Sequence, residues 1–98
     1  MAYATSNPPS LISAGPLTNE LGGRLWFYSS TDASATVRVT GYITNGGNLG
    51  MVVGDLVIMR DTTNNIISML RVVSVSATAP GAVDLSDATV VGSGTNTD

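Results

Sequence analysis

The sequence predicts a mainly β fold, a small single-domain antiparallel β-barrel or sandwich with an extended N-terminal arm. Three observations support this class. Apolar runs of strand length alternate with turn-forming residues along most of the chain. A glycine-rich stretch, residues 41–54, leads into the unbroken apolar run 56–59, which is typical of a buried strand. The 98 residues are enough for one domain with a modest core, so the remaining segments are expected to cover that strand.

Turn-forming residues divide the rest of the chain into predicted strands. We expect these strands at residues 24–30, 55–60, 66–76, 82–85 and 88–91. The polar residues 61–65 predict a β-hairpin between the second and third of them. Pro80-Gly81 marks the next turn, and residues 45–51 are expected to form a loop because they contain Asn-Gly and Gly-Asn pairs.

The strand at residues 24–30 contains three consecutive aromatic side chains and has two apolar faces. Neighbouring side chains of a strand point to opposite faces, so Trp26 and Tyr28 lie on one face and Leu25 and Phe27 on the other. In one interpretation Leu25 and Phe27 face the core, while Trp26 and Tyr28 cover its rim. In the other, Trp26 or Tyr28 lies in a subunit interface, where aromatic side chains are enriched. Because both faces are apolar, both are expected to contact protein.

Residues 31–40 fit either a strand or a short helix. Val37 and Val39 alternate with polar residues, as they would in a strand. Capping residues at positions 30–32, alanines inside the segment and a glycine at position 41 favour a short helix near residues 32–40 instead. The local pattern leaves both interpretations open.

The chain divides into an N-terminal arm (1–23), a β-rich domain (24–92) and a polar C-terminal tail (93–98). Prolines keep the arm out of helical conformation, while its scattered apolar residues give it surface to bury. One interpretation is a disordered terminus. The other is an arm that docks on its own domain or on a neighbouring subunit. The candidate interface residues are then Pro8, Pro9, Leu11, Ile12 and Leu17, together with Trp26 and Tyr28 of the aromatic strand.

Low charge is the main feature of the composition. Charged residues make up 11% of the chain, against about 25% in an average protein. A neutral surface is poorly protected against association, which suits a protein that contacts copies of itself or a partner. Net charge is −3 and the arginines are spaced singly, so we expect no nucleic-acid partner. No apolar run reaches the ~18 residues of a membrane span, so we expect no membrane partner either.

Several residue types that carry enzyme chemistry are missing. Without histidine or cysteine the chain lacks the commonest general base and any thiolate. The aspartates stand at turns or strand ends, where they hydrogen-bond the backbone. The glycine-rich loop lacks the lysine of a phosphate loop, and residues 61–65 lack the glycine and glutamate of a calcium loop. We therefore predict a non-enzyme without catalytic, metal or cofactor sites and without a small-molecule substrate. Structural turn residues are expected at Gly41, Gly46, Gly54 and Asp55.

An ordered set of short motifs resembles a group of small proteins encoded among the head genes of tailed bacteriophages. The motifs are Leu25-Trp26-Phe27-Tyr28, Ser30-Thr31-Asp32, Ala35-Thr36-Val37, Gly41-Tyr42-Ile43, Asn45-Gly46, Leu49-Gly50-Met51 and Val53-Gly54-Asp55-Leu56-Val57. They span roughly residues 25–61, with a weaker echo at 71–75. Ile43 stands where the group has an aromatic residue, and residues 32–40 are less rich in alanine. In similar proteins that segment is helical, which favours the short helix.

The resemblance implies a virion structural protein, namely a capsid decoration or cement protein. Such a protein is made in the host cytoplasm and binds the outside of the phage head. The implied partners are the major capsid protein and copies of the chain itself, with a trimer favoured over a dimer. The alternative is a host-binding module associated with a head fibre or tail fibre. Copy number in the virion separates the two, because cement proteins are abundant and fibres are few.

Overall fold

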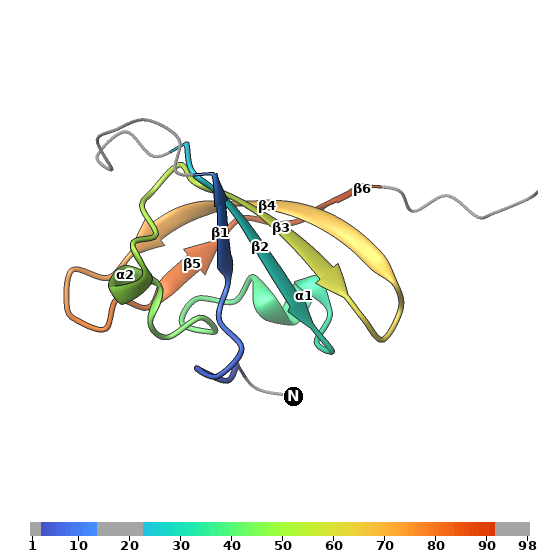
Figure 1. The fold of residues 1–98 in the computed structure, drawn as a ribbon, viewed down its shortest axis with the longest axis horizontal. Coiled ribbons are helices and arrows are strands. Elements are labelled where there is room, and N and C mark those ends of the chain that lie inside the picture. Colours follow the sequence, from blue (N-terminus) through green and yellow to red (C-terminus); the bar gives the residue numbers. More distant parts are fainter. Residues whose placement is uncertain (1–2, 14–22, 92–98) are drawn as a thin grey trace, which may run out of the picture.

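Strands form where apolar residues accumulate or alternate, and turns form at the glycines and polar runs between them (Figure 1). The computed structural model describes residues 3–13 and 23–91. Within them the strands are β1 (Ser10–Ser13), β2 (Leu25–Ser30), β3 (Leu56–Asp61), β4 (Ile66–Val75), β5 (Val83–Leu85) and β6 (Thr89–Val91). The helices are α1 (Ser34–Val37) and α2 (Gly46–Leu49). The mainly β class is confirmed, and α1 is the short helix near residues 32–40.

The described strands form an open sheet in the order β1-β2-β3-β4-β5, with β6 paired to β4. The predicted hairpin is β3–β4, whose last paired residues are Asp61 and Ile66. Asp61 holds its turn by accepting hydrogen bonds from the backbone N–H groups of Thr63 (3.0 Å) and Asn64 (3.2 Å). The polar run therefore forms a turn of the aspartate-stabilised type, as its composition predicts.

The prediction of an all-antiparallel arrangement was wrong at one pair of strands. β2 and β3 run parallel, in register from Leu25 opposite Leu56 to Ser30 opposite Asp61. A parallel partner requires the chain to cross over and return to the same end of the sheet. Residues 31–55, which include α1 and α2, make this crossover. Local periodicity specifies a strand but not its direction relative to a partner, so the sequence pattern missed this.

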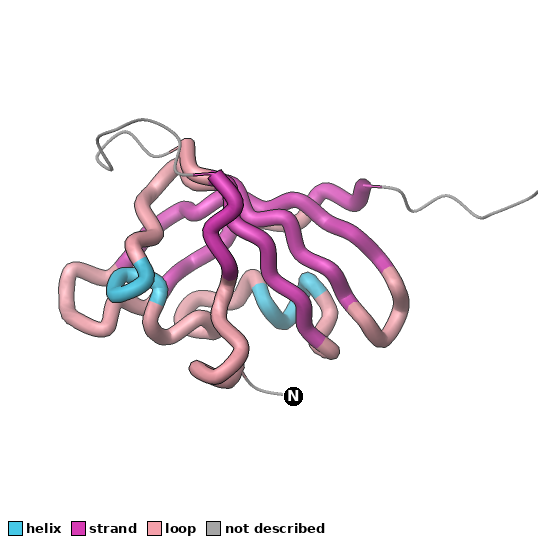
Figure 2. The backbone as a smooth tube through the Cα atoms, viewed as in Figure 1, coloured by secondary structure: helices cyan, strands magenta, loops and turns pink. Residues whose placement is uncertain are grey.

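The core lies between the sheet and the crossover. The sheet arches over both helices, which lie on the same side of it (Figures 1 and 2). We call this side the inner face. The buried apolar residues are Trp26, Tyr28, Val37, Ile43, Met51, Val57, Met59, Leu70, Val72, Val83 and Leu85. The interpretation that placed Leu25 and Phe27 in the core was wrong, because the crossover covers the opposite face of β2. Leu25 and Phe27 are half-buried.

The N-terminal segment is part of the same sheet. β1 pairs antiparallel with β2, Leu11 lying opposite Trp26. Before β1, Pro9 is buried and the ring of Tyr3 packs against the core. Residues 3–13 therefore dock on their own domain, which was one of the two interpretations of the arm. The other parts of the predicted arm and tail, residues 14–22 and 92–98, lie outside the described residues.

Residues 45–51 contain α2, where the sequence predicted only a loop. The reason is a close approach to the turn before β5. The backbone N–H of Gly47 donates to the carbonyl of Gly81 (2.9 Å). At Gly46 a side chain would meet Val83 Cγ2 at 2.1 Å, so this residue must be glycine because of packing. The prediction of Gly46 as a turn residue is corrected accordingly.

Candidate functional site

The predicted interface residues of the N-terminal segment are distributed unequally between core and surface. Leu11 and Ile12 of β1 are 45% and 56% exposed. Pro8 is half-buried and Pro9 is buried. Leu17 lies outside the described residues. Two apolar β-strand side chains thus remain available to a partner, at an edge of the sheet where β2 is the only strand among the described residues that pairs with β1.

Trp26 and Tyr28 are 2% exposed, so in this chain they offer no surface to another subunit. Their assignment to an interface is corrected. The physical reason is that both carry a polar group and the inner face supplies a partner for each. The indole Nε1–H of Trp26 donates to Asp55 Oδ2 (3.0 Å), and the hydroxyl of Tyr28 lies 3.2 Å from that of Tyr42. Buried aromatic residues with a polar group usually have such a partner.

Asp55 organises the start of the two parallel strands. Its fully buried carboxylate accepts hydrogen bonds from the backbone N–H groups of Arg24 (3.1 Å) and Val52 (3.0 Å) as well as from Trp26. The preceding Gly54 has φ +94°, which permits the turn that brings these donors together, and Gly41 likewise has φ +85°. With three donors on one carboxylate, Asp55 is a structural residue, as the sequence predicted.

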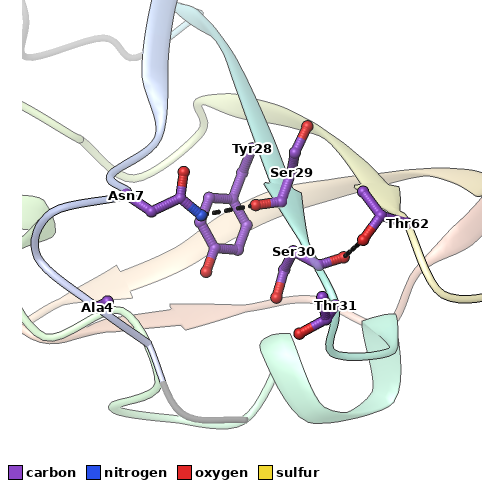
Figure 3. A pocket seen from close by; sticks show the side chains of 7 residues that line it. All are labelled: Ala4, Asn7, Tyr28, Ser29, Ser30, Thr31 and Thr62. Atoms are coloured by element: carbon purple, nitrogen blue, oxygen red, sulfur yellow. Dashed lines mark hydrogen bonds between the residues drawn. The ribbon is translucent and has the colours of Figure 1, made fainter.

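A surface hollow of about 310 Å³ lies where the N-terminal segment crosses the end of β2. Figure 3 shows its lining, which is Ala4, Asn7, Tyr28, Ser29, Ser30, Thr31 and Thr62. Much of its hydrogen-bonding capacity is used internally. Asn7 Nδ2 donates to the carbonyl of Ser29 (2.9 Å), and Thr62 Oγ1 donates to that of Ser30 (3.2 Å). The described residues that line it carry no charged side chain, so they do not provide the convergent charged and polar groups of a small-molecule site.

Tyr28, which lines this hollow, belongs to a cluster in which hydrogen bonds join Tyr28, Tyr42 and Asp32 and the ring of Tyr3 contacts both other tyrosines. The Tyr42 hydroxyl donates to Asp32 Oδ2 (2.6 Å), and the Tyr3 hydroxyl donates to Asn45 Oδ1 (2.5 Å). Ring centroids of Tyr3 lie 6.1 Å from Tyr28 and 5.8 Å from Tyr42. The sequence pattern does not reveal this cluster, because its members are far apart in the chain.

The cluster stabilises the fold through its protonated hydroxyl groups. Burial raises the pKa of the Tyr42 hydroxyl above its ordinary 10.0, and the hydrogen bond to Asp32 raises it further. Burial also raises the pKa of Tyr3. Both hydroxyls therefore stay protonated at neutral pH, so neither is a general base. The hydrogen bond of Tyr3 attaches residues 3–13 to the crossover, and the hydroxyl of Tyr42 attaches the crossover to Tyr28 and Ser30 of β2.

The described residues contain no group of three or more aspartate or glutamate side chains that could hold a metal ion. Within the same part of the chain no helix has the length and apolarity needed to cross a membrane. The chain matches no known family model, no curated protein and no solved structure. The candidate functional site is therefore argued from this chain alone, and the feature best suited to it is the exposed edge of β1.

Proposed function

We propose that the chain is a structural protein of a tailed-phage virion, a decoration or cement protein that binds the outside of the head and reinforces contacts between major capsid subunits. The observation that carries this proposal is β1, an uncharged edge strand (Ser-Leu-Ile-Ser) whose four residues are all exposed. Soluble proteins usually protect sheet edges with charge, proline or a covering segment. An exposed apolar strand without a charged residue is suited to being covered by another protein.

Two further features support a role in binding. The low charge of the chain leaves a large neutral surface, which costs little to desolvate on contact. The resemblance of residues 25–61 to head-associated phage proteins indicates which partner to test. A cement protein acts by adhesion alone, so it needs only a stable domain that presents such a surface. The capsid lattice would supply the symmetry that sets the number and arrangement of copies.

The test measures binding to heads that lack the protein, purified from a phage deleted for the gene. Wild-type protein is expected to decorate them to saturation. Replacing Leu11 and Ile12 by aspartate should lower the affinity at least tenfold, because each would place a charge at the contact. A matched control replaces Val39, which is 54% exposed, and the exposed Ala77 by aspartate, with no expected effect on binding.

Circular dichroism and thermal melting of each variant verify the fold. Wild-type protein that fails to bind heads would overturn the proposed function. Equal loss of binding in both double variants would show that added negative charge, not β1, is responsible. A low copy number in purified virions, measured by mass spectrometry, would favour the fibre-associated alternative.

A further inference from the structure

The sheet face opposite the helices carries a continuous apolar strip. We call the strip the outer face and define it by Leu25, Phe27, Leu56, Ile58, Ile67 and Met69. Paired residues share a face of a sheet, and the register places Phe27 beside Ile58 and Ile58 beside Met69. None of the six belongs to the core cluster or packs against it. They are only half-buried, and no described helix or strand lies over them (Figure 1).

Two arginines flank the strip at opposite ends of the strands. Arg71 is paired with Leu56 and Arg60 with Ile67, so both lie on the outer face, and both are exposed. Leu56 and Arg60 are four positions apart on β3, which places the two charges roughly 13 Å apart along the strand direction. Within the described part of the chain neither guanidinium forms an ion pair.

This charge pattern argues against a second copy as the partner. In an aligned face-to-face dimer, a two-fold axis along the strands would place Arg60 against Arg60 and Arg71 against Arg71. A two-fold axis across the strands would place Arg60 against Arg71. Like charges therefore meet at both ends of the strip in either arrangement, which disfavours the dimer. A complementary partner carries carboxylates where this chain carries guanidinium groups.

We propose that the outer face binds a protein surface that has an apolar centre flanked by carboxylates roughly 13 Å apart. This inference rests on the proposed function, in which that surface belongs to the assembled head. Arginine suits the role because its planar guanidinium pairs with a carboxylate through two hydrogen bonds. The apolar strip supplies the contact area between the two charges. The outer face and the edge of β1 would then contact the head as two separate surfaces.

The experiment measures the affinity of the full chain for heads that lack the protein, at low and high salt. Replacing both arginines by glutamine (R60Q/R71Q) should weaken binding about tenfold or more at low salt and flatten its salt dependence. The matched control N48D/A77E changes the net charge equally, at exposed positions away from the strip, and should bind like wild type. Met69→Gln keeps the length of a central side chain but makes it polar, and should also weaken binding about tenfold.

The outcomes separate this inference from the proposed function. If the wild type does not bind heads, the function and the partner named here both fail. If the wild type binds heads and both R60Q/R71Q and Met69→Gln bind as well as the wild type, the outer face is not the contact. The proposed function would then depend on β1 alone. A dimer in solution that Met69→Gln dissociates would assign the face to a second copy and overturn the inference. A disulfide formed within one chain by the L17C/M69C variant would show that residues 14–22 of the same chain cover the outer face. That result would also overturn the inference.

Discussion

The inner and outer faces of the sheet are built from similar apolar residues but differ in what covers them. On β2, Trp26 and Tyr28 are 2% exposed, whereas Phe27 between them is half-buried. The difference arises from the crossover, which packs both helices and Ile43 against the inner face. The inner face also offers acceptors for buried polar groups, namely Asp55 and the Tyr42 hydroxyl. Both faces are apolar enough to bind protein. The face whose buried polar groups find hydrogen-bond partners becomes the core.

The largest effect is expected from truncating the central aromatic residue of the inner face. Trp26→Ala removes a buried ring and one of the two N–H groups that donate to Asp55 Oδ2, at a cost of about 3–5 kcal/mol. A domain of this size has about 5–10 kcal/mol of stability, so most of it would be lost. Phe27→Ala on the outer face is the comparison and should cost about 1–2 kcal/mol. Urea unfolding measures both, and equal losses would abolish the distinction between the faces.

The next largest effect is expected from Asp55, which accepts hydrogen bonds on the inner face. Asp55→Asn turns an acceptor of three N–H groups into a side chain that points its own N–H toward a donor. We expect a loss of about 2–3 kcal/mol in the free energy of unfolding. Asp87→Asn is the control, because Asp87 forms an exposed ion pair with Arg38 (3.0 Å) and should contribute less than about 1 kcal/mol. An Asp55→Asn protein as stable as the control would show that packing alone selects the inner face.

A smaller effect is expected where the N-terminal segment contacts the tyrosine cluster. Tyr3→Ala removes two ring contacts and the hydrogen bond to Asn45, which together contribute about 1–2 kcal/mol. Thr5→Ala in the same segment is exposed and should change stability by less than about 0.5 kcal/mol. Hydrogen exchange should show faster exchange in β1 of the Tyr3→Ala protein. Unchanged exchange would mean that β1 is held by its pairing with β2 alone.

Alkaline pH should lower the free energy of unfolding through groups on the inner face, because all three tyrosines lie there. The pKa of Tyr42 is raised in the folded chain, so the stability linked to it is fully present below pH 10.0, its ordinary value. As the pH rises above that value, the unfolded chain releases the proton while folded Tyr42 keeps it, and the free energy of unfolding falls. Urea unfolding between pH 8 and pH 11 measures this decline. Tyr42→Phe should show a shallower decline, and an equally steep one would exclude Tyr42 as its cause.

Local sequence determined the strands, because apolar runs and alternation depend on neighbours along the chain. The segments around Trp26, Ile58 and Leu70 are strands for this reason, and the Asp61 turn follows from side chains that bond their own backbone. The sequence also placed Leu11 and Ile12 among the candidate contact residues, since apolar residues in a short proline-bearing segment have little core of their own. It showed that both faces of β2 are apolar.

Only the tertiary structure decided which face is buried and how the strands are paired. The parallel pairing of β2 with β3 depends on where the crossover returns, and no residue within either strand specifies that. Trp26 and Tyr28 belong to the core because Asp55 and Tyr42, distant in sequence, supply their hydrogen-bond partners. The outer face likewise emerged only when the register placed Arg60 and Arg71 at opposite ends of one strip. Contacts between residues far apart in the chain stabilise these arrangements, and local sequence patterns do not predict such contacts.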